Sequence, residues 1–169
     1  DGDEQYLPPT QNTTLGLFSV QHFHSGPLRL EAGARFEHSD LSASASAVVG
    51  NPDLVRSFST FSGSLGASYA IAAGWRAGLN LARSVRAPSA EELFSDGPHG
   101  GNASFELGDP GLAPEKSVGF EATISHAGEG FNLSATAYGS HFSNFLYQAP
   151  TGEVRDDLPV YASHEGRAS

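Results

Sequence analysis

The chain has 169 residues, the length of one domain, and its 19 acidic groups face 9 basic ones for a formal net charge of −10. This acidic excess argues against nucleic-acid binding, because a phosphate backbone would repel it. There is no cysteine, which excludes disulfides and thiolate metal sites. No apolar run approaches the roughly 20 residues of a membrane-spanning helix. Strands that cross a membrane alternate and are not excluded by low hydropathy.

Alternation of apolar and polar residues predicts long β-strands along the chain. The first, at 13–24, is the least regular, because Leu17 and Phe18 are adjacent, which suggests a bulge. The clearest is 27–38, where apolar side chains occupy one face and Arg29 and Glu31 begin the other. Further strands follow at 61–71, 75–81, 117–124 and 131–137, and a seventh begins near Pro159.

The connections between these strands alternate in length. The tight, glycine-bearing turns are 25–27, 72–74 and 127–130, and the long polar connections are 39–56, 87–116 and 148–158. Successive turns of an antiparallel meander lie at opposite ends of the sheet, so all short turns share one end. Outer-membrane barrels have this arrangement, with short periplasmic turns and long extracellular loops.

Strand length favours the same fold. The runs last about 10 to 15 residues, against about 5 to 6 in globular proteins and about 9 to 11 for a tilted membrane-crossing strand. The faces opposite the apolar ones carry charges of both signs, which suits a wet lumen better than a soluble β-sandwich or lipocalin-like barrel. We therefore predict an all-β fold, an antiparallel up-and-down transmembrane β-barrel segment. Seven strands fall short of a closed bacterial barrel, so residues 1–169 are expected to be part of a larger one, truncated at both ends.

One stretch carries a family resemblance. RSVRAPSAEELFSDGPHGGNASFELGDPGLAPEKSVGFE, residues 83–121, resembles the late barrel region of TonB-dependent outer-membrane receptors. The resemblance lies in R-x-x-R-A-P, then E-E-L-F, and then F-E-x-G-D-P-x-L-x-P-E-K-S at 105–117. The Gly-Pro-His at 97–99 is similar to the zinc-uptake branch of that family.

This resemblance implies a receptor in the outer membrane of a Gram-negative bacterium. Such a receptor captures a scarce nutrient, a metal ion or metal chelate with zinc favoured, for energy-coupled uptake. It implies a barrel of about 22 strands with a plugged lumen, of which residues 1–169 form a partial β-barrel domain without the plug. The implied partners are outer-membrane lipid, the transported metal and TonB, which contacts the plug. No enzyme activity, catalytic residue, cofactor or nucleic-acid partner is expected.

The loop motifs also carry local expectations. Gly97, Gly100 and Gly101 are expected to allow positive φ and a compact loop, and 109–111 predicts a turn with proline in its second position. The arginines of the R-x-x-R motif, Arg83 and Arg86, are expected to anchor the base of the loop or lipid headgroups rather than to bind substrate.

The histidines are the candidate metal ligands. His22 and His24 share a strand face and could hold one ion, although polar residues near the periplasmic rim are the simpler interpretation. His99 lies in the long loop with Asp96 three residues before it. Imidazole and carboxylate suit Zn²⁺ at about 2.0 to 2.2 Å. We predict His99 and Asp96 as ligands of a transported Zn²⁺, completed by groups from elsewhere; the alternative is a surface histidine without a ligand.

Two other functions compete with the receptor. A passive porin or adhesin barrel would show the same strands and loops, and sequence outside this chain would be needed to separate it from a receptor. A barrel hydrolase is the weaker rival, since serines and histidines are present but no G-x-S-x-G elbow occurs.

Overall fold

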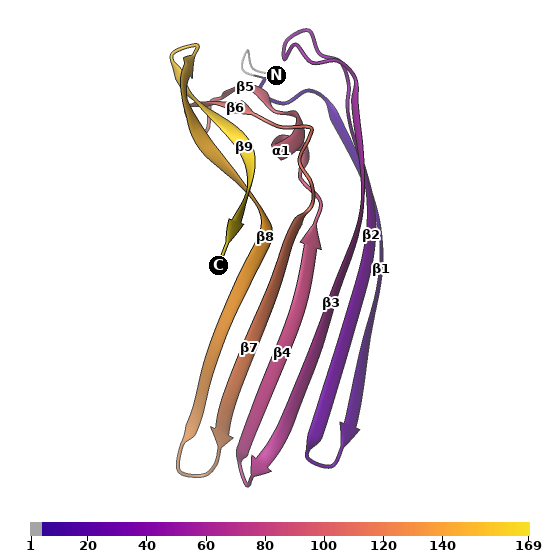
Figure 1. Cartoon of the computed structure of the whole chain (residues 1–169), viewed down its shortest axis with the longest axis vertical. Coiled ribbons are helices and arrows are strands. Elements are labelled where there is room, and N and C mark those ends of the chain that lie inside the picture. Colours follow the sequence, from indigo (N-terminus) through magenta and orange to yellow (C-terminus); the bar gives the residue numbers. More distant parts are fainter. Residues whose placement is uncertain (1–4) are drawn as a thin grey trace.

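A computed structural model describes residues 5–169 and consists of one curved sheet with a small helix at one end (Figure 1). The long strands are β1 (Thr10–Ser25), β2 (Leu28–Ala43), β3 (Leu54–Ala72), β4 (Trp75–Arg86), β7 (Glu115–Ala127), β8 (Asn132–Arg155) and β9 (Leu158–Ala168). Between β4 and β7 lie α1 (Ala90–Phe94), β5 (Asp96–His99) and β6 (Ser104–Leu107). The predicted all-β fold with seven long strands is confirmed. Within the described residues no helix is long and apolar enough to cross a membrane.

The strand order is β1-β2-β3-β4-β7-β8-β9-β6-β5. All neighbouring strands pair antiparallel except β6 and β9, which pair parallel from Phe105↔Val160 to Leu107↔Ala162. The predicted antiparallel meander is confirmed for the seven long strands, and the β5–β6 hairpin, which was not predicted, leaves its own connection and adds to β9. Over residues 5–169 the sheet does not close, and β1 and β5 are its two edges.

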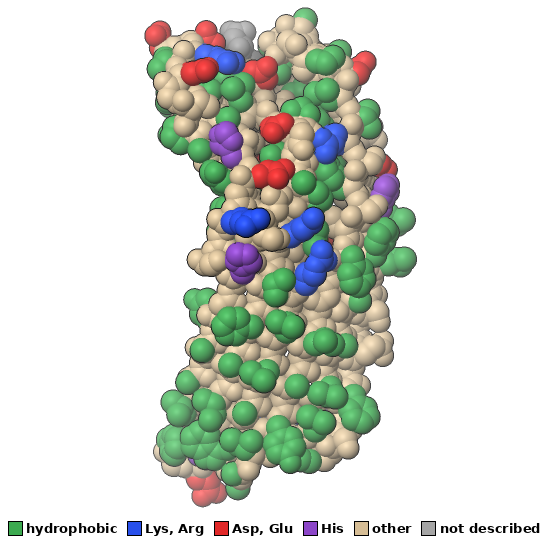
Figure 2. All heavy atoms as spheres, in the orientation of Figure 1, with side chains coloured by type: hydrophobic (Ala, Val, Ile, Leu, Met, Phe, Trp, Pro, Cys, Tyr) green, Lys and Arg blue, Asp and Glu red, His purple; other side chains and the backbone are tan. Residues whose placement is uncertain are grey.

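The register separates the two faces of the long strands as predicted. Leu30 pairs with Ala67, and Leu65 with Leu81, so apolar side chains line up on one face. Glu31 pairs with Gly66 on the opposite face, which also carries Arg29 and its partner Ser68. We call these the apolar face and the polar face. Figure 2 shows the apolar face, with hydrophobic side chains from the short-turn end to about mid-height and Lys and Arg side chains gathered above them.

The predicted bulge in β1 is wrong. Its pairing with β2 is continuous from Thr10↔Ala43 to Ser25↔Leu28. Leu17 pairs with Phe36 on the apolar face and Phe18 pairs with Arg35 on the polar face. Two adjacent apolar residues therefore need no extra residue in the strand, because one of them simply faces the lumen side.

The turns confirm the predicted sorting by end, with one correction. Short turns follow β1, β3 and β7 at one end, and residues 44–53 and 87–114 form longer connections at the other (Figure 1). The predicted loop 148–158 is wrong, because β8 continues to Arg155 and only a two-residue turn leads to β9. Asp156 and Asp157 have φ of 51° and 61°, as a tight hairpin turn requires. Pro150 lies within β8, at the start of a shift in its pairing register with β9.

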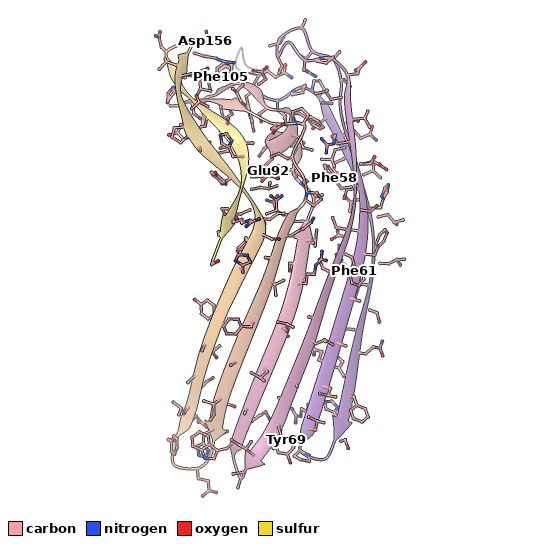
Figure 3. All side chains as sticks on the ribbon, viewed as in Figure 1. Phe58, Phe61, Tyr69, Glu92, Phe105 and Asp156 are labelled. Atoms are coloured by element: carbon pink, nitrogen blue, oxygen red, sulfur yellow. The ribbon has the colours of Figure 1, made fainter. Side chains whose placement is uncertain are left out.

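The buried core lies only in the loop-end half of the described chain. Its members come from the long strands and from the 87–114 connection: Leu41, Ala43, Phe58, Leu93, Phe94, Leu112 and Leu146. Leu41 pairs with Arg56 on the polar face, so the connection folds back over that face. Figure 3 shows Phe58 at this end and Tyr69 near the short turns. We call residues 87–114 the mouth loop, and the seven buried residues the mouth core.

Candidate functional site

The mouth loop begins with a short helix that was not predicted from the sequence. Ser89 precedes α1 and its Oγ accepts a hydrogen bond from the Glu92 amide at 3.2 Å, while Glu92 Oε2 accepts from the Ser89 amide at 2.7 Å. This reciprocal pair is a capping box, which stabilises a helix start. Leu93 and Phe94 then enter the mouth core. The helix holds the loop on the polar face of the sheet.

Arg86 closes the base of the loop. Its guanidinium donates to both oxygens of Glu92, at 2.8 and 3.0 Å, and lies 3.4 Å from Glu115 at the start of β7. The hydrogen bonds with Glu92 are the main reason that the pKa of Arg86 is raised. Burial alone would raise the pKa of Glu92, but hydrogen bonds from Arg86 and Ser89 outweigh it and the pKa is lowered. The structure thus agrees with the expectation that Arg86 anchors the loop.

The β5–β6 hairpin forms the outer part of the mouth loop. The predicted positive φ at Gly97, Gly100 and Gly101 is wrong; among the described residues of this loop, positive φ occurs at Ala103, at 50°. Gly97 is required for a different reason. A Cβ there would lie 2.8 Å from the backbone of residues 5 and 6, which crosses β5 at close range. The predicted turn at 109–111 is confirmed by the Leu112 amide bonding to the Asp109 carbonyl at 3.2 Å.

His99 lies at the end of β5 in a shell of polar and aromatic contacts. Its Nδ1 is 2.8 Å from Glu106 Oε1, and its ring stacks on Tyr6 with centroids 4.2 Å apart and planes 8° from parallel. Asn102 donates to the same Glu106 oxygen at 3.0 Å, and Gln148 donates to the other at 3.4 Å. The Glu106 side chain is 6% exposed. The imidazole is therefore held by its ring face and by one nitrogen.

The charge state of Glu106 sets the tautomer of His99. Burial alone would raise the pKa of Glu106, but the hydrogen bonds from His99, Asn102 and Gln148 stabilise the ionised form and lower the pKa. An ionised carboxylate only accepts hydrogen bonds, so the 2.8 Å contact requires a proton on Nδ1 of His99, and Asn102 Nδ2, 3.2 Å from the same nitrogen, then donates to Glu106 instead. In the neutral ring Nε2 then keeps its lone pair. Nε2 faces Gly101, where a Cβ would come within 3.4 Å, so the glycine leaves this nitrogen uncovered.

A pocket of about 380 Å³ lies between the hairpin, α1 and the β8–β9 pair. Its lining is mostly polar and acidic: Ser89, Glu91, Glu92, His99, Asn102, Glu106, Leu146, Tyr147, Gln148 and Ser163. Within residues 5–169, Ser163 Oγ is buried and has no hydrogen-bond partner. Glu91 accepts a hydrogen bond from the Tyr6 hydroxyl at 3.2 Å. The site combines carboxylates, an imidazole and one unsatisfied hydroxyl, a donor set that suits a cation.

The structure separates the two residues predicted as metal ligands. Asp96 and His99 are three residues apart on β5, and alternation along a strand directs them to opposite faces. Glu106, rather than Asp96, contacts His99. Across residues 5–169, no group of three or more histidine and acidic side chains could hold a metal ion. Metal binding by His99 and Asp96 therefore stays a prediction.

The other histidines lie away from this pocket. His22 and His24 are on the polar face of β1 near the short turns, and Nδ1 of His22 is 3.0 Å from Glu31 Oε2. His38 lies on the apolar face and contacts Ser59 at 3.0 Å. Tyr6, Gln148 and Ser163 were not identified from the sequence. They reach the pocket from remote parts of the chain and had no local motif to mark them.

Comparison with known families decides the identity of the fold. Residues 1–168 match the family described as TonB dependent receptor-like, beta-barrel. The chain belongs to this family. The resemblance carried by residues 83–121 is thereby confirmed at the level of the TonB-dependent receptors. The Arg86–Glu92–Glu115 contacts give the family-like motif its role in this chain, which is to close the base of the mouth loop.

Three solved structures share the fold of this receptor barrel. A double mutant of the Serratia marcescens hemophore receptor HasR, in complex with its hemophore HasA and heme, is 15% identical with a TM-score of 0.76, covering 96% of this chain and 31% of that chain. The copper transporter OprC is 19% identical with a TM-score of 0.74, and the match covers 94% of this chain and 24% of OprC. The siderophore receptor PirA from Pseudomonas aeruginosa is 14% identical with a TM-score of 0.58, and the match covers 91% of this chain and 37% of PirA.

These comparisons fix the class of protein. The chain spans roughly a quarter to somewhat over a third of the three receptor chains, and at these identities the likeness shows the fold alone. The family match therefore makes this chain a barrel region of the TonB-dependent receptor family. The three structures are named for heme with a hemophore, copper and a siderophore, and none of these names supports zinc specifically.

Proposed function

We propose that this chain forms part of the barrel wall and mouth of an outer-membrane receptor that takes up a metal ion or metal chelate, with zinc as the favoured cargo. The family membership supports energy-coupled uptake over a passive porin, an adhesin or a hydrolase. Residues 1–169 would be a partial barrel domain, and a plug elsewhere in the protein would contact TonB in the periplasm. The open edge at β1 and the partial coverage of the three receptors support this division.

The proposal places the mouth loop outside the Gram-negative cell. The turns after β1, β3 and β7 lie at one end of the sheet, and the mouth loop, the 44–53 connection and the β8–β9 turn lie at the other (Figure 1). In outer-membrane barrels the short turns are periplasmic. Cargo arriving from outside would therefore meet the polar pocket of the mouth loop first.

The observation that carries the metal proposal is the tethered imidazole of His99. Histidines that bind metal usually donate their second ring N–H to a carboxylate, which orients the ring and raises its basicity. Here Nδ1 bonds to the buried, ionised Glu106, and Nε2 lies beside Gly101 with no hydrogen bond among the described contacts. This is the arrangement that a metal ligand needs before the ion arrives.

The chain supplies an incomplete ligand set. Zn²⁺ prefers four ligands, and His99 offers one nitrogen. Glu91 lines the same pocket, and among the described contacts its carboxylate has a hydrogen bond only from Tyr6. It is the carboxylate candidate, because Glu92 and Glu106 are already held by Arg86 and His99. The remaining ligands would come from other parts of the receptor or from a chelator that travels with the ion.

Calorimetric titration of the full-length receptor with Zn²⁺ tests this proposal. His99→Ala is expected to weaken binding by at least about tenfold, or 1.4 kcal/mol. His38→Ala is the matched control, because it removes an imidazole from the apolar face and is expected to leave the affinity unchanged. Equal affinity of the His99→Ala variant and the wild type would leave an uptake receptor whose cargo is not recognised through this histidine.

The predicted ligand Asp96 is tested in the same titration. It points away from His99 in the structure, so it would bind the same ion only after a rearrangement of β5. Asp96→Asn on β5 and Glu91→Gln in α1 each remove one negative charge. A larger loss for Glu91→Gln would support the pocket, and a larger loss for Asp96→Asn would support the ligand pair predicted from sequence.

A further inference from the structure

Basic side chains replace apolar ones at the same level on three neighbouring strands of the apolar face. On β4 the outward series Ala77, Leu79 and Leu81 is followed by Arg83. Arg83 pairs with Val118 of β7, and Val118 pairs with His141 of β8. Lys116 follows Val118 at the next outward position of β7, opposite Val85. The register therefore places the three groups as a cluster of neighbours just beyond the apolar series of β4 and β7, and Figure 2 shows basic side chains at the upper border of the hydrophobic ones.

The cluster is compact and exposed. Side chains directly opposite on neighbouring strands have Cβ atoms about 5 Å apart, and diagonal neighbours lie about 7 to 8 Å apart, within reach of long side chains. Arg83, Lys116 and His141 are all exposed. Within residues 5–169 neither Arg83 nor Lys116 forms an ion pair with a carboxylate. Their charges therefore have no counterpart in this part of the protein.

Two contacts fix the cluster in place. Arg83 donates to the carbonyl of Phe61, near the point where the pairing of β3 and β4 ends. His141 Nδ1 lies 2.7 Å from the Ser169 hydroxyl, so this contact uses one ring nitrogen and not Nε2. Lys116 has the greatest freedom of the three. A fixed guanidinium beside two further nitrogens is suited to a group with several acceptor oxygens.

The level of the cluster matches a membrane boundary. Trp75, at the short-turn end of β4, packs on His126 with ring centroids 4.7 Å apart, and His126 packs on Phe131 at 4.4 Å. Arg83 is about eight residues further along, which corresponds to about 26 Å of strand and about 20 Å of depth at a tilt of about 40°. The apolar band of an outer-membrane barrel is about 25 Å tall and is flanked by interfacial residues. Arg83 thus lies at the edge of the hydrocarbon opposite the aromatic cluster.

We propose that Arg83, Lys116 and His141 bind the phosphate of a phosphorylated lipid headgroup in the outer leaflet. Arginine binds phosphate through two parallel hydrogen bonds, and lysine adds a point charge. Below them the apolar series on β4 and β7 would cover the acyl chains of the same lipid. The assignment to the outer leaflet rests on the proposed function, because it takes the mouth loop to be extracellular.

The test is lipid retention by the full-length receptor in a neutral detergent, counted by native mass spectrometry. The probe is a diphosphorylated lipid A, compared with the same lipid after removal of its phosphates. Arg83→Gln with Lys116→Gln is expected to weaken binding of the phosphorylated lipid by at least about tenfold and to leave the dephosphorylated lipid unaffected. Arg29→Gln with Arg76→Gln removes the same charge from the polar face and is expected to change neither.

Lys116→Gln alone controls for misfolding, because the Lys116 side chain has no hydrogen bond or ion pair among the described contacts, whereas the Arg83 side chain bonds to the Phe61 carbonyl. It is expected to weaken binding about threefold. Inorganic phosphate at the lipid's concentration is expected not to displace it, which separates a lipid site from a free-phosphate site. Unchanged lipid affinity in both variants, or an equal loss in the Arg29/Arg76 control, overturns the proposal. Zn²⁺ titration of the same variants is expected to be unchanged, so failure here and failure of the metal proposal are distinguishable.

Discussion

Two regions of the sheet are stabilised in different ways. The wall is the part of the long strands nearer the short turns, and the mouth is the opposite end, where the mouth loop and the mouth core lie. In the wall, large apolar side chains are exposed on one face: Leu65 is 64% exposed and Leu79 is 67% exposed. In the mouth, Leu41, Leu93 and Leu112 are each 1% exposed. Among the described residues the wall contributes no member of the mouth core near the short turns, and in the proposed receptor lipid would cover its apolar face. The mouth carries a small globular core built by folding a loop onto the polar face.

This difference separates two requirements within one chain. The wall must match a bilayer and a wet lumen, so its side chains need only the right polarity on each face. The mouth must hold a pocket in a fixed shape in water, so it needs close packing and buried hydrogen bonds. Substitutions in the two regions are therefore expected to fail in different assays.

The largest effect is expected in the mouth core. Leu93→Ala removes a fully buried side chain and is expected to destabilise the mouth by about 2 to 5 kcal/mol. Hydrogen exchange at the amides of α1 and β6 in the full-length receptor measures this loss. Leu79→Ala makes the same truncation on the lipid side of the wall and is expected to leave exchange in α1 unchanged. Faster exchange in α1 from Leu79→Ala would show that wall and mouth are one cooperative unit.

A charge on the lipid face is expected to have the next largest effect. Leu79→Arg places a cation in hydrocarbon and is expected to cost about 2 to 4 kcal/mol of folding free energy in a bilayer. Ser64→Arg, on the polar face of the neighbouring strand, is expected to cost far less. Reversible refolding titrations of the full-length receptor into lipid vesicles compare the two. Equal costs would contradict the assignment of the faces.

Acid is expected to produce the smallest effect, and only in the mouth. The folded-state pKa values of Glu92 and Glu106 are lowered, so their contribution to stability is present above the ordinary value of about 4.5 and is lost as the pH falls through the lower folded value. We expect less than about 1 kcal/mol, because the partners Arg86 and His99 are partly exposed and solvent screens both contacts. Exchange in α1 measured between pH 6 and 3 should show the loss, and Glu92→Gln with Glu106→Gln should flatten it. An equal loss of protection in the Glu92→Gln, Glu106→Gln variant would show that other carboxylates cause the acid effect.

The wall was predictable because its information is local. Alternation in 27–38 and 61–71 fixed both the strand and the face that each side chain takes, and tight turns such as Ala73–Gly74 fixed which strands pair. The errors in the strands arose at Pro150 and Gly152, where residues typical of loops lie within β8 because a register shift accommodates them. The polar sequence from residue 148 onward was interpreted as a loop, although it is the end of β8, which stays a strand beyond the wall.

The mouth was predictable only in part, because its contacts join remote segments. The Ser89-x-x-Glu92 spacing before Leu93 is a local signal for α1 that the sequence interpretation left unused. The register His99↔Ser104 brings Glu106 within reach of His99, and a hairpin at Gly100–Ala103 would have indicated this. No comparable signal marks Tyr6 or Ser163, since each meets the hairpin only after the chain has folded.

The parallel pairing of β6 with β9 has a mechanical consequence for the mouth. The backbone pairs Phe105↔Val160, Glu106↔Tyr161 and Leu107↔Ala162 attach the mouth loop to a hairpin that lies more than 50 residues away in the sequence. β9 is in turn paired with the extended end of β8. The loop is thus fastened at both sides of the opening, at Arg86 and at β9. A displacement of the β5–β6 hairpin must either shear these three pairs or carry the tip of β8 and β9 with it, so the moving part would include the rim strands as well as the loop.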